Sequence, residues 1–260
     1  MTIRKRFGQH FLEPAWVRKV VEAIGPAPGE TFLEIGPGRG ELTVPLAERA
    51  GRVIAVEIDR DLAAALPSRV PANVRVVCAD VLATDLATML DDDEVALRVA
   101  GNLPYNISTP ILFQLVALSS VRRLRDATLM LQKEVVERLV AAPGTKEYGV
   151  LPVVVGRHAR IERLLTLPPG AFRPPPAVTS AVVRLAFLDP SEIPDAPAGF
   201  EALVRRLFTR RRKTMGNALS AAAGVPAAEA AARLQRLGID PRRRPETLTL
   251  AEFLTVARAT

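Results

Sequence analysis

The amino-acid sequence predicts an α/β fold, in which a mostly parallel, doubly wound sheet precedes a small all-helical domain. Three observations lead to this prediction. In the first half of the chain, short apolar segments each end at a polar residue or glycine, and these end residues recur every 21 to 23 positions, the length of one strand-plus-helix unit. Prolines then interrupt the chain near residue 190. The residues after them have helical composition.

Four strands are expected in the first half of the chain. Their ranges are 31–35, 52–56, 74–78 and 95–100, with helices over 42–50 and 61–66. The polar or glycine residues just past these strands are Gly36, Glu57, Asp80 and Asn102. The carboxyl ends of parallel strands share one edge of a sheet, and ligands bind at that edge. We therefore expect a ligand crevice lined by these four residues.

Further elements complete the predicted sheet domain. We expect helices over 110–118 and 134–142, and strands over 127–132, 151–155 and 179–188. Five prolines flank Phe172 between residues 168 and 176. Because proline fixes its own backbone and restricts the residue before it, the segment around Phe172 is predicted to be a rigid, extended loop.

The chain is expected to form two domains, because its 260 residues exceed the usual size of one. Prolines at 190, 194 and 197 mark a linker between them. We predict a sheet domain over 1–189, a proline-rich linker over 190–199 and a helical domain over 200–260. The helices of the last domain are expected over 200–211, 226–237 and 250–257.

The positive charge of the chain is concentrated in its last part. The formal net charge is +7, yet residues 1–200 contain 23 Lys and Arg against 23 Asp and Glu, whereas residues 201–260 contain 12 against 5. Such an asymmetry favours a polyanionic partner, above all a nucleic acid. The alternative is a solvated arginine-rich surface in a heat-adapted protein.

Composition also limits the compartment and the kinds of site. The single cysteine, Cys78, excludes an internal disulfide and a cysteine-built zinc site. No run of about 18 uncharged apolar residues is present in the sequence. We therefore expect a cytoplasmic protein that binds no membrane and no metal.

A glycine-rich turn follows the first predicted strand, in the segment Glu34–Gly40 (EIGPGRG). Glycines permit a ligand to approach the backbone closely. A dinucleotide-binding turn would need glycine at position 41, where this chain has Glu41. Glu57 is placed to accept from ribose hydroxyls and Asp80 from an adenine amine, although a solvated glutamate and a helix-capping aspartate are the ordinary alternatives. Together these features resemble the class I S-adenosylmethionine-dependent methyltransferases.

The tetrapeptide Asn102–Tyr105 (NLPY) has the groups needed to methylate an exocyclic amine. The lone pair of adenine N6 is delocalised into the ring, so two hydrogen-bond acceptors on its N–H groups would favour a nucleophilic, pyramidal nitrogen. The Asn102 side chain and the Leu103 carbonyl would be these acceptors. Pro104 would fix the turn, and Tyr105 would offer a ring for stacking. The alternative is a structural proline turn with a packed tyrosine.

Four segments resemble the ribosomal RNA adenine dimethyltransferases, in order and over nearly the whole chain. They are 5–12 (KRFGQHFL), 102–108 (NLPYNIS), 172–180 (FRPPPAVTS) and 208–219 (FTRRRKTMGNAL). The last segment resembles the basic helix of the small-subunit branch of this family. The chain departs from the family pattern at His10, where asparagine is common, and at Ala177, where a basic residue is common.

The resemblance implies a function and a set of site residues. The expected reaction is dimethylation of two adjacent adenines in the 3′-terminal hairpin of small-subunit (16S) rRNA, late in ribosome assembly, by a monomer that uses S-adenosylmethionine and releases S-adenosylhomocysteine. The implied cofactor residues are His10, Leu12, Gly36, Gly38, Glu57, Asp80 and Asn102. The implied catalytic and base-holding residues are Asn102, Leu103, Pro104, Tyr105 and Phe172. The implied RNA-binding residues are Arg210, Arg211, Arg212 and Lys213.

Two other functions fit the same residues. The first is the same chemistry on large-subunit rRNA, by analogy with the dimethylases that confer antibiotic resistance, or a role as a mitochondrial relative. The second is a binder of immature ribosomal subunits that acts as an assembly checkpoint. A small-molecule methyltransferase is poorly supported, since it would not need the basic tail.

Overall fold

The computed structural model describes residues 10–89, 96–121 and 123–260. The chain forms two compact units, and neither is continuous in sequence. The first consists of Met1–Val136 and Ala159–Pro190, and the second of Glu137–His158 and Ser191–Thr260. The sequence led us to expect one break, over 190–199. The structure also assigns the segment Glu137–His158 to the helical unit.

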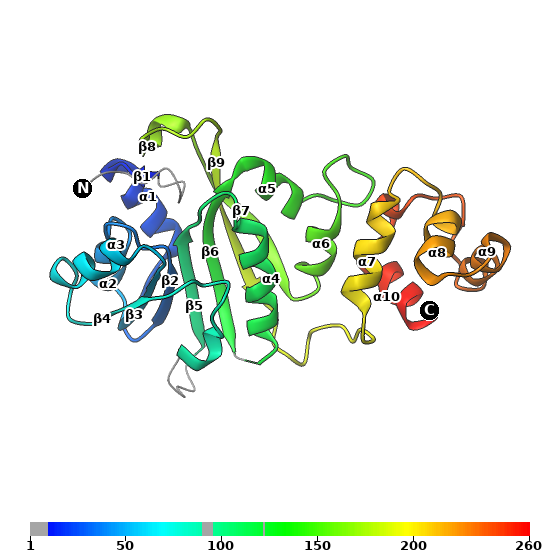
Figure 1. The fold of residues 1–260 in the computed structure, drawn as a ribbon, viewed down its shortest axis with the longest axis horizontal. Helices are drawn as coiled ribbons and strands as arrows, with labels where there is room; N and C mark the ends of the chain where they lie inside the picture. The colour runs from blue at the N-terminus through cyan, green and yellow to red at the C-terminus, as the bar shows by residue number, and fades with distance from the viewer. Residues whose placement is uncertain (1–9, 90–95, 122) are drawn as a thin grey trace. The chain divides into compact units, whose positions relative to one another are not determined.

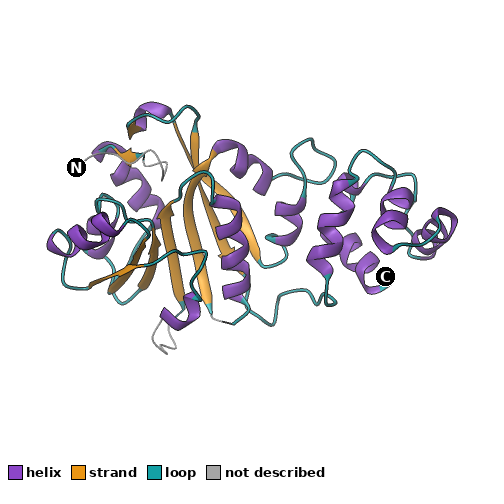
Figure 2. Ribbon diagram, viewed as in Figure 1, coloured by secondary structure: helices purple, strands orange, loops and turns teal. Residues whose placement is uncertain are grey.

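The first unit is built on one twisted sheet (Figures 1 and 2). Its strands are β2 (Thr31–Ile35), β3 (Arg52–Glu57), β4 (Val74–Cys78), β5 (Leu97–Asn102), β6 (Leu124–Gln132), β7 (Ala159–Leu167) and β9 (Ser180–Phe187). Their order across the sheet is β4-β3-β2-β5-β6-β9-β7. The pairs from β4 to β6 are parallel, whereas β9 pairs antiparallel with both β6 and β7. This confirms the predicted α/β class.

Helices cover this sheet and fix its core. They are α1 (Pro14–Ile24), α2 (Thr43–Ala47), α3 (Arg60–Ala65), α4 (Ser108–Ser119) and the start of α5 (Lys133–Leu139), with 3₁₀ turns at Leu66–Ser68, Leu86–Met89 and Pro169–Ala171. Helix α1 begins with a proline, whose missing N–H is not needed in the first turn, and ends at Gly25 in the left-handed conformation. Its buried face packs into a cluster that includes Phe32 and Leu46.

A second, two-stranded sheet lies beside the first one. Strand β1 (Phe11–Leu12) pairs antiparallel with β8 (Phe172–Arg173), so that Leu12 is opposite Phe172. The Glu13 backbone N–H also donates to the Ala171 carbonyl at 2.9 Å. These contacts bring the segment at residue 10 next to the proline-rich segment, which lies more than 160 residues away in sequence.

The second unit is helical. It contains α6 (Val150–Val154), α7 (Phe200–Thr209), α8 (Met215–Ala223), α9 (Ala227–Arg236), a 3₁₀ turn at Pro245–Thr247 and α10 (Leu250–Arg258). Hydrogen bonds explain why the segment 137–158 belongs here. The Tyr148 hydroxyl donates to the Leu248 carbonyl at 2.9 Å, and the Arg157 guanidinium donates to the Pro194 carbonyl at 2.8 Å.

One of the sequence-based assignments is wrong, and one strand was missed. The residues 151–155 form helix α6 and its end rather than a strand. Pro152 lies in the first turn of this helix, where an N–H has no acceptor, whereas the same proline would interrupt the hydrogen bonds of a central strand. Strand β7 was not predicted, because its residues are mostly part-buried or exposed and include Arg160, Glu162 and Arg163.

None of the helices in the described part of the chain has both the length and the apolar character that a membrane span requires.

Candidate active site

The glycine-rich turn leaves strand β2 at the edge where the parallel strands end. Gly36 and Gly38 adopt φ angles of 71° and 61°, in the left-handed region that favours glycine. A Cβ on Gly38 would lie 3.2 Å from the ring of Phe11. The turn therefore depends on glycine for its conformation, and at Gly38 also for its close packing.

Glu57 is held at the end of β3 by two backbone groups. Its carboxylate accepts from the Gly38 N–H at 3.0 Å and from the Asp59 N–H at 2.9 Å. Burial raises the pKa of Glu57, and these two hydrogen bonds oppose that effect. The glycine turn and the next strand end are thus joined through a single side chain.

Glu34 lines the site but was not predicted from the sequence. It is 1% exposed, and burial raises the pKa of its carboxyl to about 8, with the nearby Glu41 and Glu57 adding to the effect. Among the described residues, its Oε2 has no hydrogen-bond partner. The protonated Glu34 carboxyl therefore has an oxygen that is available for a hydrogen bond with a ligand. The sequence signal that could have identified Glu34 is its position two residues before Gly36, the first glycine of the turn.

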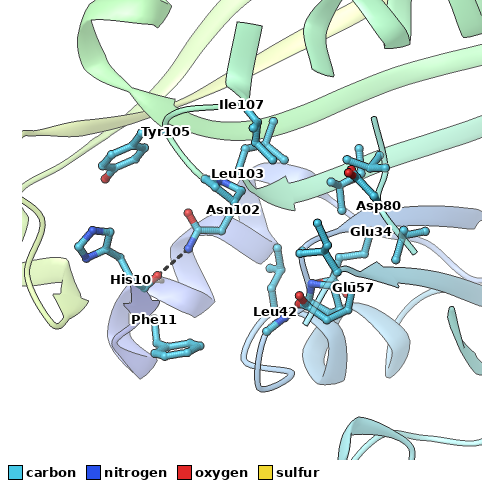
Figure 3. A pocket seen from close by; sticks show the side chains of 18 of the residues that line it. His10, Phe11, Glu34, Leu42, Glu57, Asp80, Asn102, Leu103, Tyr105 and Ile107 are labelled. Atoms are coloured by element: carbon cyan, nitrogen blue, oxygen red, sulfur yellow. Dashed lines mark hydrogen bonds between the residues drawn. The ribbon is translucent and has the colours of Figure 1, made fainter. Parts of the chain in front are cut away.

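These groups line one cavity of about 310 Å³ at the carboxyl ends of β2 to β5 (Figure 3). This volume is within the range of small-molecule sites, which begins near 300 Å³. The side chains of Ile58 and Leu82 lie in its wall although they are 43% and 39% exposed. Carboxylates at successive strand ends, together with apolar surface and an unsatisfied buried acid, fit a ligand that carries a ribose, a flat base and charged groups, as S-adenosylmethionine does.

Asn102 lies at the end of β5 and is oriented by a distant part of the chain. Its side-chain N–H₂ donates to the His10 carbonyl at 2.8 Å. Since a carbonyl can only accept, the amide nitrogen must face His10 and the amide oxygen must point away from it, toward the side of Tyr105 in Figure 3. An acceptor is thereby presented at the cavity wall.

Tyr105 is fixed by its hydroxyl group. The oxygen is hydrogen bonded to the Ser180 hydroxyl at 2.6 Å, and burial raises the pKa of the phenol. The imidazole of His10 stacks against the Tyr105 ring, with centroids 5.7 Å apart and planes inclined by 23°. Tyr105 lies within a turn that is closed by a hydrogen bond from the Ile107 N–H to the Pro104 carbonyl at 3.2 Å.

Nearly all the predicted cofactor and catalytic residues come together in this cavity. Those in its wall are His10, Leu12, Gly36, Gly38, Glu57, Asp80, Asn102, Leu103, Pro104 and Tyr105. The first part of the N-terminal motif, residues 5–9, lies outside the described residues. Phe172 is the exception, since it does not line this cavity.

Comparison with known proteins gives the family. The family described as "Ribosomal RNA adenine dimethylase" matches residues 1–260. The chain belongs to this family. The ribosomal RNA small subunit methyltransferase A of Aromatoleum aromaticum is 48% identical to it, covering 97% of this chain and 92% of that protein. The protein of the same name from Acinetobacter baylyi is 46% identical, covering 98% and 91%.

Solved structures agree with the family. A dimethyladenosine transferase from Plasmodium falciparum matches with a TM-score of 0.79 and 25% identity, over 95% of this chain and 96% of that one. The 23S rRNA methyltransferase ErmE matches with a TM-score of 0.69 and 25% identity, over 96% and 98%. This ribosomal RNA adenine dimethylase is therefore an S-adenosylmethionine-dependent enzyme with a class I methyltransferase fold.

Phe172 lies outside this cavity of the dimethylase, and its role in holding the target base stays a prediction. Its side chain is completely buried, in the core cluster that also contains Leu12 and Ala171. It is absent from the cavity wall. The prolines around it do form an extended segment, but β8 pairs with β1 and turns the ring inward. An aromatic residue between prolines was therefore a core residue.

The basic run of the dimethylase does not lie on a helix. Residues 210–213 form the turn between α7 and α8, whereas the resemblance implied a basic helix over the segment 208–219. Arg211 is ion-paired with Glu246 at 2.8 Å and also donates to the Lys146 carbonyl. Arg210, Arg212 and Lys213 are exposed.

Proposed function

We propose that this enzyme dimethylates N6 of two adjacent adenines in the 3′-terminal hairpin of small-subunit (16S) rRNA, in late subunit assembly. It acts as a cytoplasmic monomer. The observation that carries the chemistry is the Asn102 amide, whose oxygen is turned toward Tyr105 by the hydrogen bond to His10. The choice of the small subunit is supported by the names of relatives that are 46% and 48% identical over nearly the whole chain.

The cofactor residues are proposed from their places around the cavity. Glu57 would accept from the ribose hydroxyls, and Asp80 would accept from the adenine amine of the cofactor. The turn at Gly36 and Gly38 would allow close approach of the ligand, and His10 and Leu12 would close the cavity. When bound, S-adenosylmethionine supplies a methyl group on a sulfonium that is already activated.

The chain's own residues then need to position the amine rather than deprotonate it. The Asn102 oxygen and the Leu103 carbonyl would accept from the two N–H groups of N6, which favours a pyramidal nitrogen whose lone pair is available. Pro104 holds both acceptors in one turn, and Tyr105 gives the base a flat surface. Positioning and preoriented dipoles are the main sources of rate enhancement in such a site.

RNA binding is assigned to the turn between α7 and α8. Arg210, Arg212 and Lys213 are exposed there, which makes them available to phosphate groups. Arg211 would act with them, although its guanidinium is already ion-paired with Glu246. Residues 201–260 of the helical unit contain 12 Lys and Arg against 5 Asp and Glu, an excess of positive charge.

The experiment is methyl transfer from labelled S-adenosylmethionine to small subunits that lack the modification, with large subunits and free rRNA in parallel. We expect label as N6,N6-dimethyladenosine in the 3′-terminal hairpin of the small subunit. Label confined to large-subunit RNA would instead indicate the resistance-type reaction. Tight binding to small subunits without any label would favour a checkpoint role.

A further inference from the structure

A glutamine on helix α4 holds the turn that follows strand β4. The side-chain nitrogen of Gln114 donates to the Val81 carbonyl at 2.5 Å and to the Thr84 carbonyl at 3.0 Å. Because both partners are carbonyl oxygens, which only accept, the orientation of the amide is fixed and both of its N–H groups are used. One side chain thus ties both ends of the segment 81–84 to a helix that lies at least 30 residues later in the sequence.

Asp80 begins this turn and sets its shape. Its Oδ1 accepts from the Leu82 N–H at 2.9 Å, and its carbonyl accepts from the Ala83 N–H at 3.1 Å and from the Thr84 hydroxyl at 2.8 Å. These hydrogen bonds are local, so they shape the turn without placing it against the sheet. The two hydrogen bonds from Gln114 contribute to that placement.

The turn forms one end of the cavity. Asp80, Val81 and Leu82 line the cavity wall, and Figure 3 shows Asp80 on the side of Glu57, away from Tyr105. The side chain of Leu82 is 39% exposed, which makes it available to the face of a flat ligand. The Asp80 carboxylate has a second oxygen besides the one that accepts from Leu82. An apolar surface beside an acceptor suits a base that carries an amine, such as adenine.

We propose that Gln114 is a positioning residue for S-adenosylmethionine. By holding the segment 81–84, it keeps the Asp80 carboxylate and the Leu82 side chain where they take the adenine of the cofactor. Gln114 does not itself line the cavity, so it acts through the turn and not by touching the ligand. This inference rests on the proposed role of Asp80 and not on the choice of ribosomal subunit.

Helix α4 is suited to this task because its first turn belongs to the active site. Ile107, directly before the helix, lines the cavity, and the Ser108 hydroxyl donates to the Pro104 carbonyl at 3.2 Å. Ile107, Ile111 and Gln114 have the spacing of one helix face, and Ile111 is completely buried. The same helix therefore supports both the turn with the proposed N6 acceptors and the turn that would hold the base of the cofactor.

Two substitutions at position 114 remove the donors. Gln114→Leu keeps a side chain of similar size, and Gln114→Glu keeps the shape but turns a negative carboxylate toward both carbonyls. Asn73→Leu is the matched control. The Asn73 amide also donates to main-chain carbonyls, among them those of Ala47 at 2.9 Å and Ala50 at 3.2 Å, but directly before β4 and so at the end of that strand away from the cavity.

Asp80→Asn tests the contact with the base. If the amide oxygen of this variant keeps the hydrogen bond from the Leu82 N–H, the amide nitrogen presents a donor to the base in place of an acceptor. The probes are S-adenosylhomocysteine and S-inosylhomocysteine, whose base has a carbonyl in place of the amine. We expect the parent to bind the adenosyl ligand about 10-fold or more tightly than the inosyl ligand, and Asp80→Asn to lower this ratio to about 1 or below.

The measurement is the calorimetric Kd of both ligands for every variant. Gln114→Leu should weaken binding of S-adenosylhomocysteine by about 5- to 30-fold, from the loss of two hydrogen bonds that hold the turn, and should lower the ratio of the two Kd values toward that of Asp80→Asn. Gln114→Glu should have the larger effect. On whichever ribosomal RNA the parent methylates, kcat at saturating S-adenosylmethionine should stay within about 2-fold, so that the loss appears in KM for the cofactor.

Asn73→Leu should lower the midpoint of thermal unfolding and leave both Kd values within about 2-fold of the parent. The same behaviour in Gln114→Leu, a less stable protein with an unchanged Kd ratio, would overturn the inference and make Gln114 a structural residue only. Because both ligands are measured on one preparation, their Kd ratio does not depend on the fraction of protein that is folded.

Two further outcomes separate this inference from the proposed function. A fall in kcat of Gln114→Leu without a change in either Kd would also overturn the inference, because it would place Gln114 on the side of the target base. An unchanged Kd ratio in Asp80→Asn would remove the proposed role of Asp80 and this inference with it. The RNA that the parent methylates is tested separately, by the labelling experiment above.

Discussion

The side-chain amide of Asn102 donates to the backbone carbonyl of His10 at 2.8 Å, although the two residues are 92 positions apart in the sequence. This hydrogen bond decides which way the amide faces, and so where its acceptor oxygen lies. The N-terminal segment is in turn held by the pairing of β1 with β8. The orientation of the proposed catalytic acceptor thus depends on three segments that are remote in sequence.

Asn102→Asp should abolish most of the activity. The carboxylate of the variant cannot donate to the His10 carbonyl. Its negative oxygens would be repelled by the carbonyl oxygen of His10, so the side chain would turn away from that carbonyl. We expect kcat to fall by about 100-fold or more, as for other lost dipoles at a reacting centre. Small-subunit binding, measured by co-sedimentation, should be within about 2-fold of the parent. Methylation at the parental rate would contradict the role of this side chain.

Glu57→Gln should weaken cofactor binding and lower stability slightly, because an amide can accept from only one of the two backbone N–H groups that hold this side chain. A neutral amide loses charge-assisted hydrogen bonds to ribose hydroxyls, which contribute roughly 1.5–3 kcal/mol each. The Kd for S-adenosylmethionine should therefore rise by about 10- to 100-fold in calorimetry. Glu48, which is exposed just after α2, provides the control variant Glu48→Gln. An equal Kd for the two variants would remove Glu57 from the cofactor site.

Glu34→Gln should change how stability depends on pH. The folded pKa of Glu34 is raised to about 8 from its ordinary 4.5, so the folded chain keeps a proton that the unfolded chain releases between these values. Its contribution to the free energy of unfolding is complete below pH 4.5 and is lost as the pH rises to about 8. Glutamine mimics the neutral acid at every pH. The variant should therefore gain thermal stability relative to the parent as the pH rises from about 5 to about 8. A difference in midpoint temperature that does not change with pH would contradict the buried, protonated state of Glu34.

His158 should make the helical unit sensitive to acid. Its ring is 5% exposed and accepts from the Arg157 guanidinium at 3.0 Å. Burial, and the charge of Arg157, lower the pKa of His158 from 6.5 to about 4. The unfolded chain binds a proton between these values and the folded chain does not, so the free energy of unfolding should fall as the pH drops from 6.5 to 4.

The amount lost through His158 is at most about 3 kcal/mol. His158→Gln retains an acceptor for Arg157 but cannot be protonated, so its denaturant midpoint should fall less over the same acid range. Parallel acid profiles for the parent and the variant would show that His158 does not carry the effect. Unchanged kcat at neutral pH serves as the control that the active site is intact.

Replacing Arg210, Arg212 and Lys213 together by glutamine should weaken binding to ribosomal subunits in a salt-dependent way. Each phosphate contact contributes about 0.7–0.9 to the slope of log affinity against log salt concentration. The slope should therefore decrease by about 2 to 3, while the cofactor Kd is unchanged. An unchanged slope would place the RNA contact elsewhere. Arg211 is left in place because its ion pair with Glu246 belongs to the fold of the unit.

The strand ends could be predicted because they follow a period in the sequence. The strands 31–35 and 74–78 were predicted with the bounds that β2 and β4 have, and the residues after the four strands do line one cavity. The strand bounds follow from the local sequence pattern. The shared cavity follows from the rule that the carboxyl ends of parallel strands lie at one edge of the sheet. The family followed from the motifs at 102–108 and 172–180, and the comparisons confirm it.

What could not be predicted depends on contacts between remote segments. The inward turn of Phe172 results from pairing with Leu12, and no local pattern encodes that pairing. The basic residues 210–213 have helical composition, but the chain turns there between two helices. The position of the His10 ring on Tyr105 likewise requires the N-terminal segment to reach Pro174. In each case burial or a long-range hydrogen bond outweighs local propensity.

The most direct measurement is the amount of N6,N6-dimethyladenosine at each position of small-subunit rRNA, by mass spectrometry of nuclease fragments. Unmethylated small subunits would be incubated with S-adenosylmethionine and either the parent enzyme or Asn102→Asp. We expect two adjacent dimethylated adenines in the 3′-terminal hairpin with the parent and almost none with the variant. Modification at another site, or equal modification by both proteins, would contradict the proposed function and the role of Asn102, respectively.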